Sequence, residues 1–354
     1  MNAAAKSYDG LNKYIRITDI DEASSTYTDK DIVSPDGVLT DNYLVNNCDI
    51  LLARTGASTG KSYLYKKSDG KLYYAGFLIR ANVTTHDPYF VFSQLHTHRY
   101  WRWVSIMSAR SGQPGINSQE YSSFPIYTTS IEEESKIAKL LSLLDERIAT
   151  QNKIIDKLQT FIKGIVDSTI LRKEKNAIVG DVCSISEQIR AEANIDDIIT
   201  VRLHGNGVCK SSAENLQLGA TQYYRRRAGQ LIYGKQNFHN GAIGIVPISL
   251  DNGITSKDIP SFDIDEMMCN SVYLLAQLQS PQYYKPAEAL TTGTGSKRLK
   301  EETFLKMPIV LPNKREQDNI ATLIISISAN LDQAKKMLDL FSIQKQYLLR
   351  QMFI

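Results

Sequence analysis

Residues 51–65, LLARTGASTGKSYLY, contain the residue types of a nucleotide-binding loop: two glycines, a lysine and a serine. A phosphate-binding P-loop has four residues between its glycines and opens an α-helix. Here the glycines enclose only three residues, and the run after Lys61 predicts a strand followed by a hairpin at the Asp-Gly pair 69–70. The stretch therefore predicts a glycine-rich loop between strands, with Arg54 and Lys61 projecting from it, in preference to a nucleotide site.

Other residue types that could do chemistry are scattered. The four cysteines lie far apart without CxxC spacing, which predicts reduced, mostly buried thiols, and the five histidines lack partners at ligand spacing, so no metal is expected. The sequence contains no motif of a methyltransferase, a nucleotide hydrolase, a GxSxG hydrolase or a zinc protease. We expect a chain that is not an enzyme.

The composition of the chain has no dominant charge. Of 354 residues, 41 are Lys or Arg and 38 are Asp or Glu, so any nucleic-acid-binding surface must be local. The chain has no run of eighteen apolar residues and no secretory signal. We therefore expect a cytoplasmic protein without a membrane partner.

The chain repeats itself with an offset of 183 residues. EESKIAKL at residues 133–140 corresponds to EQDNIATL at 316–323, and the same offset pairs Pro125 with Pro308. The loop at 111–115 corresponds to 292–295, and, at a slightly different offset, residues 49–52 correspond to 230–233. The order is globular unit, long helix, globular unit, long helix.

Both long helices are predicted from apolar positions three and four residues apart. Ser130 and Asn313, each followed three residues later by Glu, are the expected N-terminal caps. Helices with such stripes need a partner, and the simplest is each other in an antiparallel coiled coil; separate burial in one large core is the alternative. The residues expected to pair the helices or dock partners are Ile137, Leu141, Leu144, Ile148, Ile155, Leu158, Ile162, Ile320, Ile324, Ile327, Leu331, Leu338, Phe341 and Leu348.

Short apolar and aromatic runs separated by turn signals predict mixed, mostly β globular units. Expected strands include residues 14–17, 50–53 and 77–80 in the first unit and 198–201, 230–233 and 242–246 in the second. A helical stretch is expected near residues 89–108, with an equivalent at 266–278. The predicted fold class is α+β: two similar units, two long antiparallel helices and pseudo-two-fold symmetry.

This series of motifs, present twice, resembles the DNA-specificity subunit of type I restriction-modification systems over nearly the whole chain. In the first half the series is a strand with Asp-Ile-Leu before a Gly-rich loop, a Ser-Gly-x-x-Gly-Ile-Asn turn, a hydrophobic-Pro pair, then Glu-Glu opening a long helix. The second half has Gln-Leu-Ile, Thr-Gly-Thr-Gly, a hydrophobic-Pro pair and Glu-Gln at the corresponding places. The resemblance implies two target recognition domains that read a bipartite, non-palindromic site on double-stranded DNA, with the helices as spacer. It also implies two modification (methyltransferase) subunits carrying S-adenosylmethionine, and restriction subunits; this chain itself would bind no cofactor.

The resemblance divides the chain into four parts. They are a first recognition domain at 1–129, a central helix at 130–175, a second recognition domain at 176–312 and a C-terminal helix at 313–354. Residues 178–185 open the second domain, and their counterpart in the first would fall before residue 1. We therefore expect a first domain that is shortened at its N-terminus.

The candidate DNA-binding residues are those that donate or accept toward bases, or toward phosphates, in corresponding loops. In the first domain they are Arg54, Thr55, Ser58, Lys61, Arg110, Ser111, Gln113 and Asn117. In the second domain they are Lys235, Gln236, Asn237, His239, Asn240, Thr292, Thr294, Ser296, Lys297 and Arg298. Asn117 could equally cap its own turn, and the run 225–227, RRR, could be a phosphate contact or a solvated strand end.

The main alternative is a coiled-coil scaffold whose loops bind protein without base readout. On this alternative the two helices would still pair, but the Arg, Lys and amide side chains in the loops would not read DNA bases. A nucleotide-hydrolysing enzyme is a third hypothesis, and it depends only on the near-match at residues 51–65.

Overall fold

A computed structural model describes residues 1, 3–109, 113–211, 221–293 and 297–353. The chain forms two compact units. The first unit consists of Met1–Ile154 with Ala334–Ile354, and the second unit consists of Ile155–Gln333. Each unit therefore holds one globular part and one end of both long helices.

The first unit begins with short strands and three short helices. Its strands are β1 (Ala4–Ser7), β2 (Lys13–Ile15), β3 (Val33–Asp36), β4 (Asp49–Ala53), β5 (Ser62–Leu64), β6 (Leu72–Tyr74) and β7 (Leu78–Asn82). Its short helices are α1 (Pro88–Gln94), α2 (His98–Met107) and α3 (Ser118–Ser122). The long helix α4 (Ile131–Val166) begins here and continues into the second unit.

The second unit has more strands and a similar order. Its strands are β8 (Ala177–Ile178), β9 (Cys183–Ile185), β10 (Arg190–Ala191), β11 (Ile199–Val201), β12 (Val208–Lys210), β13 (Tyr223–Arg225), β14 (Leu231–Tyr233), β15 (Ile243–Ile245), β16 (Ile254–Ser256), β17 (Ser261–Ile264) and β18 (Pro308–Ile309). Its helices are α5 (Ser271–Leu278), α6 (Pro281–Tyr284), α7 (Glu301–Leu305) and the first part of α8 (Lys314–Met352).

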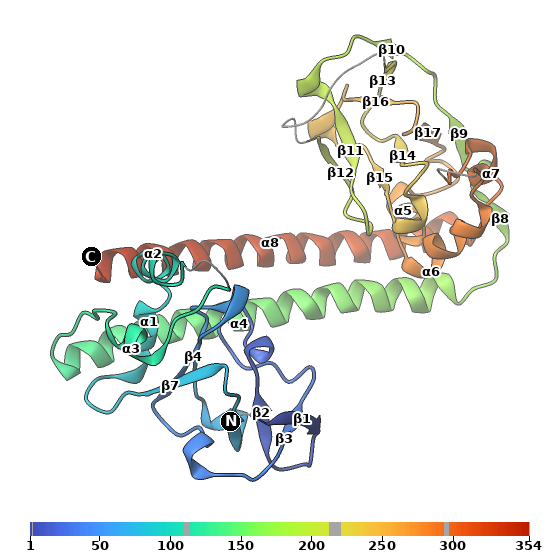
Figure 1. Ribbon diagram of the computed structural model, residues 1–354. Coiled ribbons are helices and arrows are strands. Elements are labelled where there is room, and N and C mark those ends of the chain that lie inside the picture. Colours follow the sequence, from blue (N-terminus) through green and yellow to red (C-terminus); the bar gives the residue numbers. More distant parts are fainter. Residues whose placement is uncertain (2, 110–112, 212–220, 294–296, 354) are drawn as a thin grey trace. The chain divides into compact units, whose positions relative to one another are not determined.

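The same antiparallel sheet occurs in both units. In the first unit the strand order is β5-β4-β7, and in the second unit β15-β14-β17, extended by β9. The central strand of each sheet is wholly buried, as its continuous apolar sequence predicts. The offset between matching strands is close to that of the sequence repeat, so the duplication is a structural one (Figure 1).

One buried side chain at the start of each long helix makes the same hydrogen bond in both units. Oε2 of Glu134, on α4, accepts the backbone N–H of Asp87 at 3.0 Å, and Oε1 of Gln317, on α8, accepts the N–H of Asn270 at 2.9 Å. Asp87 and Asn270 in turn cap the N-termini of α1 and α5. Because Glu134 and Gln317 are almost fully buried, these bonds fix the start of each long helix to its globular part.

A second pair anchors the segment before each long helix. The amide Oε1 of Gln94 accepts the N–H of Tyr127 at 2.7 Å, and that of Gln277 accepts the N–H of Val310 at 3.0 Å. Both pairs stand at the offset of 183 residues. The repeat therefore preserves polar contacts between elements as well as apolar positions.

In the first unit, the start of α4 lies antiparallel to the end of α8 (Figure 1). Ala138 and Leu141 pack in one cluster with Leu349 and Phe353. Further along α4, Asp145 pairs with Lys345, the Arg147 guanidinium stacks over the Phe341 ring, and the Gln151 amide donates to Ala334 O at 3.1 Å. Residue numbers rise on one helix as they fall on the other, which defines the antiparallel pairing.

In the second unit, the end of α4 packs against the start of α8. Leu158, Ile162 and Ile165 share a cluster with Ile320 and Ile324, closed by Tyr273 of α5. All fourteen residues of the predicted stripes are buried or partly buried. The predicted fold class, α+β with two similar mixed units and two long antiparallel helices, is confirmed.

Three local predictions differ from the structure. The Asp-Gly pair 69–70 does not close a hairpin, because β5 pairs with β4 while β6 pairs in parallel with β2. The single helical stretch expected near residues 89–108 is two helices, since Thr97 caps a new start with its hydroxyl accepting the N–H of Tyr100. In the second unit, the equivalent helix begins at Ser271 rather than near residue 266.

The cysteines follow the expectation of free thiols. Cys183 and Cys269 are buried, Cys48 and Cys209 are partly buried, and burial raises the pKa of the first two to about 12. Among the described residues, no helix is long and apolar enough to span a bilayer. The same residues include no cluster of three or more side chains suited to hold a metal ion.

Candidate nucleic-acid interface

The glycine-rich loop of the first unit follows β4 and is held from several sides. Gly56 and Gly60 have φ of +73° and +96°, a region that favours glycine. A Cβ at Gly60 would lie 2.7 Å from Val104 Cγ1 on α2, so this position also needs a residue without a side chain. The glycines thus serve a turn and a close helix contact.

Several backbone N–H groups of the same loop are already bonded within the protein. The N–H of Gly56 donates to Pro114 O at 2.9 Å, and that of Lys61 donates to Ser58 O at 3.0 Å. The N–H of Gly60 lies 3.1 Å from both Ala53 O and the Tyr121 hydroxyl. A strand follows the loop, not a helix. This geometry contradicts the P-loop hypothesis.

Two predicted loops of the first unit meet at Arg54. The N–H of Arg54 donates to Phe77 O at 3.1 Å, and Arg54 O accepts the N–H of Ile116 at 2.9 Å. A β-bridge joins Thr55 to Gly115 beside it. The structure therefore brings residues 54–61 and the described part of the second loop, 113–117, to one place.

The second unit repeats this arrangement around Lys235. The N–H of Lys235 donates to Asp258 O at 2.9 Å, and Lys235 O accepts the N–H of Leu299 at 2.9 Å. Thr292 and Arg298 bridge each other through two backbone bonds. Arg54 and Lys235 thus occupy equivalent backbone positions, each a cationic residue at the end of the central strand.

The side chains at this place form a basic hollow in the second unit. Its volume is about 660 Å³, and its lining includes Lys235, Thr292, Arg298, Lys300 and Glu301. A hollow with three cations and one acid attracts anionic groups such as DNA phosphates. Lys297 is exposed nearby in sequence, whereas Thr294 and Ser296 lie outside the described residues.

Most cations of the candidate interface are paired with an acid. Lys235 Nζ lies 2.7 Å from Glu301 Oε1, and Lys61 Nζ lies 3.0 Å from Glu22 Oε2. Arg298 pairs with Asp258, and Lys297 pairs with Glu288, both at 3.3 Å. Within the part of the chain that the structure describes, the exposed Arg54 forms no ion pair.

The remaining candidate DNA-binding residues of the first unit differ in how far their side chains are exposed and free to contact DNA. Gln113 is exposed, and Thr55 and Ser58 are partly exposed. The side chain of Asn117 accepts the N–H of Glu120 at 2.9 Å and caps α3, which favours the structural alternative stated for it above. Arg110 and Ser111 lie outside the described residues.

In the second unit, the loop after Lys235 carries its amides outward. Gln236 and Asn237 are exposed, while Phe238 is fully buried and anchors the loop. Asn240 donates to the side chain of Asn237 at 3.2 Å, and His239 is partly buried beside it. Two amide side chains on a fixed turn are suited to contact base edges.

The three arginines at residues 225–227 differ in their exposure to solvent. Arg225 and Arg227 are exposed, but Arg226 is fully buried and donates to Thr255 Oγ1, Ser261 Oγ and Ile259 O at 2.7–3.0 Å. Burial lowers the pKa of Arg226 to about 10, so it stays charged at neutral pH. Arg226 is therefore a structural residue. This role is neither the phosphate contact nor the solvated strand end that the sequence suggested for the run.

The sequence also missed the acids that hold the loop cations. Glu22, Asp258 and Glu301 lie far in sequence from their partners. At the offset of 181 residues that relates Arg54 to Lys235, Asp258 corresponds to the uncharged Phe77, so the repeat does not mark Asp258 as an ion-pairing position.

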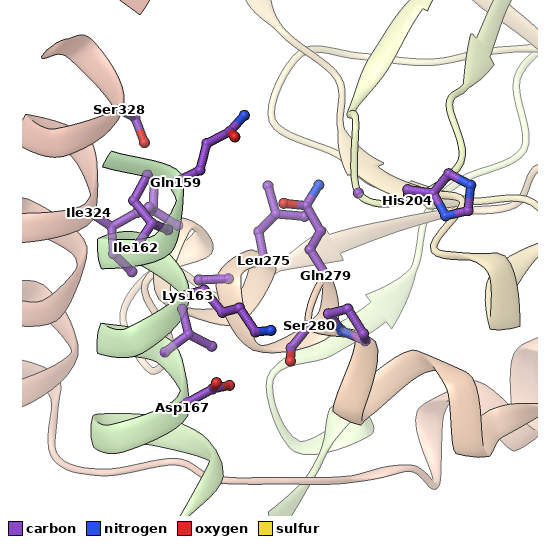
Figure 2. A pocket seen from close by; sticks show the side chains of 15 residues that line it. Gln159, Ile162, Lys163, Asp167, His204, Leu275, Gln279, Ser280, Ile324 and Ser328 are labelled. Carbon is purple, nitrogen blue, oxygen red and sulfur yellow. The ribbon is translucent and has the colours of Figure 1, made fainter. Parts of the chain in front are cut away.

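A separate cavity of about 490 Å³ lies in the second unit between α4, α5 and α8 (Figure 2). Figure 2 shows Lys163 on α4 and Asp167, the residue after α4, across the cavity from Leu275 on α5 and Gln279, the C-cap residue of α5. The offset of 183 residues pairs Val272, Leu275, Gln279 and Ser328 of the cavity with Tyr89, Phe92, His96 and Asp145.

In the first unit the equivalent space holds larger side chains. The hydroxyl of Tyr89 donates to Asp145, and the rings of Tyr89, Phe92 and His96 lie against one another. The cavity of the second unit therefore follows from smaller side chains at the same positions, and it lies apart from the basic hollow in its lining residues.

Comparisons with known proteins agree with this geometry. Residues 2–160 match the model of the type I restriction modification DNA specificity domain. The specificity subunit of the type I restriction enzyme MjaVIII of Methanocaldococcus jannaschii is 22% identical, over 83% of this chain and 75% of that relative.

Solved structures share the fold. The type I restriction-modification S subunit from M. genitalium superposes with a TM-score of 0.65 at 13% identity, covering 98% of this chain and 89% of that one. A chain from a structure of complex assembly and conformational transition in the type I R-M system gives 0.51 at 13% identity, covering 96% and 90%. Residues 2–160 of this chain therefore resemble the type I restriction modification DNA specificity domain, and the chain as a whole shares the fold of type I restriction-modification S subunits.

Proposed function

We propose that each unit reads one half of a bipartite, non-palindromic DNA sequence. The observation that carries this proposal is the equivalence of Arg54 and Lys235, which stand at the same backbone position in two repeated folds. Their neighbours differ: a Gly-rich loop with Gln113 in the first unit, and Gln236 and Asn237 in the second. Equivalent positions with different side chains are what two unlike half-sites require.

The phosphate and base contacts divide between these residues by their chemistry. Lys61, Lys297 and Arg298 supply charge and suit phosphate contacts, which set affinity and register. The exposed guanidinium of Arg54 and the amides of Gln236 and Asn237 have the fork geometry that distinguishes guanine or adenine. The helix pair then fixes the number of unread base pairs between the halves.

We further propose that two modification subunits dock on the long helices and carry S-adenosylmethionine, and that restriction subunits join them. Support comes from a second apolar stripe on α8: Leu340, Ile343 and Tyr347 are 59%, 63% and 61% exposed. These positions recur every three to four residues, as a helix-binding face does. On this proposal, this chain contributes recognition and no catalytic group.

The test uses the complete complex and DNA carrying the target. Arg54→Ala is expected to weaken binding 5- to 100-fold and relax one base of the first half-site, leaving the second half-site unchanged. Lys235→Ala is expected to act on the second half-site only. If both variants assemble normally and neither changes sequence preference, the loops do not read bases and the scaffold alternative stands.

Docking of the modification subunit is tested separately. Ile343→Lys places a charge in the exposed stripe and is expected to abolish co-purification, whereas Lys335→Ala, at an exposed position on another face of the same helix, leaves it intact. Unchanged co-purification of the Ile343 variant would refute docking at this stripe.

A further inference from the structure

Phe77 is a large apolar side chain presented to solvent at the candidate interface. It lies in the turn between β6 and β7 and is 63% exposed. The turn is held by three backbone bonds: Gly76 N–H to Met1 O, Leu78 N–H to Ala75 O and Arg54 N–H to Phe77 O, at 2.8–3.1 Å. The ring is therefore held outward by a fixed backbone, one hydrogen bond away from Arg54.

The exposure of Phe77 alone does not indicate a function, because single apolar side chains are common on protein surfaces. The inference depends instead on the position of Phe77 in the repeated fold. In the second unit the equivalent bond runs from Lys235 N–H to Asp258 O, and the Asp258 side chain pairs with Arg298 of the basic hollow. In the second unit, the counterpart of Phe77 therefore lies at the face that we propose to contact DNA.

The two units place opposite chemistries at this position. Asp258 has a carboxylate, already held by an arginine, whereas Phe77 has no polar atom in its side chain. A DNA base edge offers one apolar group in the major groove, the 5-methyl of thymine. An aromatic ring on the residue whose backbone bonds to Arg54 matches a thymine near the base that the Arg54 guanidinium contacts.

We propose that Phe77 is a specificity-determining residue of the first unit that contacts the methyl group of a thymine in the first half-site. This inference rests on the proposed function, and it adds a base contact outside the polar residues assigned above. It requires the first half-site to contain at least one T·A pair.

The experiment measures binding of the assembled complex to its target with each thymine of the first half-site replaced in turn by deoxyuridine. This change removes one methyl group and keeps base pairing. For the wild type, one replacement is expected to weaken binding about three- to fivefold, the effect of one buried methyl group. Phe77→Ala is expected to weaken binding to the thymine target by at least as much and to be insensitive to that replacement.

The matched control is Leu11→Ala. Leu11 is also 63% exposed, but it precedes β2 at the end of the parallel β2–β6 pair opposite to the turn that holds Phe77. This variant is expected to bind like the wild type and to keep the response to deoxyuridine. Thermal unfolding of both variants confirms that the exposed substitutions leave the fold intact.

Three results would overturn the inference: a first half-site without a T·A pair, no sensitive thymine, or a Phe77→Ala variant that keeps the wild-type response. The proposed function fails differently. If Arg54→Ala also leaves sequence preference unchanged, the first unit does not read DNA; if Arg54→Ala relaxes the half-site while Phe77→Ala does not, only the inference about Phe77 fails.

Discussion

Glu301 is predicted to restrain DNA binding through its ion pair with Lys235. Their charged atoms are 2.7 Å apart, and the side chains are only 12% exposed for Lys235 and 27% for Glu301. A lysine in this pair has to leave its acid, or share it, before it contacts a phosphate or a guanine. Glu301→Gln removes the charge and keeps the shape, so it should release Lys235 for DNA.

The size of the effect follows from the pair's environment. Ion pairs open to solvent contribute about 0.2–1 kcal/mol, and this short, largely enclosed pair belongs at the upper end. A release of about 1 kcal/mol tightens the Kd about fivefold. Glu22, the partner of Lys61, is 83% exposed, so Glu22→Gln should change binding less than twofold.

The assay is titration of the assembled complex against labelled target DNA at several salt concentrations. Glu301→Gln is expected to lower the Kd and to steepen log Kd against log salt by about 0.9 if the freed lysine takes up one phosphate. The double variant with Lys235→Ala should show no gain. Since Glu301 opens α7, thermal unfolding controls for a lost helix-dipole interaction of up to about 1 kcal/mol.

A weaker Kd for Glu301→Gln, with normal thermal unfolding, would refute this reasoning. It would mean that Glu301 positions Lys235 for its DNA contact instead of competing with that contact. If Glu301→Gln increased the DNA affinity equally in the Lys235→Ala variant, the competition between Glu301 and DNA for Lys235 would also be refuted. The increase would then come from the loss of one negative charge and not from the release of Lys235.

Three further predictions concern stability of the purified chain in urea. Burial lowers the pKa of His96 from 6.5 to about 4, so the unfolded chain binds the proton more tightly and stability falls by up to about 3 kcal/mol as pH drops from 6.5 toward 4. His96→Gln should remove this loss. The joint change Val272→Tyr and Ser328→Asp, which copies the first unit, should fill the cavity and stabilise the second unit by about 1–2 kcal/mol. Arg226→Met should destabilise the second unit by about 2–3 kcal/mol, because Ser261 Oγ and Ile259 O lose their donor in a buried site.

Each of these has a clear contrary result. Both tryptophans, Trp101 and Trp103, lie in the first unit, so their fluorescence follows the His96 variant, while circular dichroism follows both units. An unchanged pH dependence for the His96 variant would assign the acid loss to other groups. A destabilised cavity variant would show that the α4–α5–α8 space differs in shape between the repeats, and a neutral Arg226 variant would contradict its structural role.

The features that could be predicted from the sequence are those that repeat with a period. Apolar positions three and four residues apart define α4 and α8, and their caps at Ser130 and Asn313 accept the N–H of the third residue along, as expected. The repeat, with offsets of 181 to 183 residues, located the equivalent loops of both units. Such local and repeated signals do not depend on knowing what a strand or helix packs against.

The failures share one physical reason, which is that tertiary partners decide them. The pair 69–70 is a good hairpin signal, but β6 finds β2 instead of β5 because Lys13–Ile15 offers a parallel edge. Arg226 lies between exposed arginines in sequence, and its acceptors Thr255, Ser261 and Ile259 lie on a distant segment that draws it inward. The acids that pair with Lys61 and Lys235 lie on distant segments, which a single sequence does not connect to them.

The central claim is that two base-reading units are kept at a set distance by the paired helices. Seven residues, two helical turns, can be inserted into both helices at the borders of the compact units, after Ile154 in α4 and after Gln333 in α8. The Gln151–Ala334 hydrogen bond places these borders opposite each other. The insertion lengthens each helix by about 10 Å, the length of about three base pairs of DNA.

Sequencing the methylated positions in the genome of a host that carries the complete system with this variant measures the recognition site directly. We expect the same two half-sites, separated by a longer unread gap. If the same two half-sites were found at the original gap, the helices would not set the distance between them.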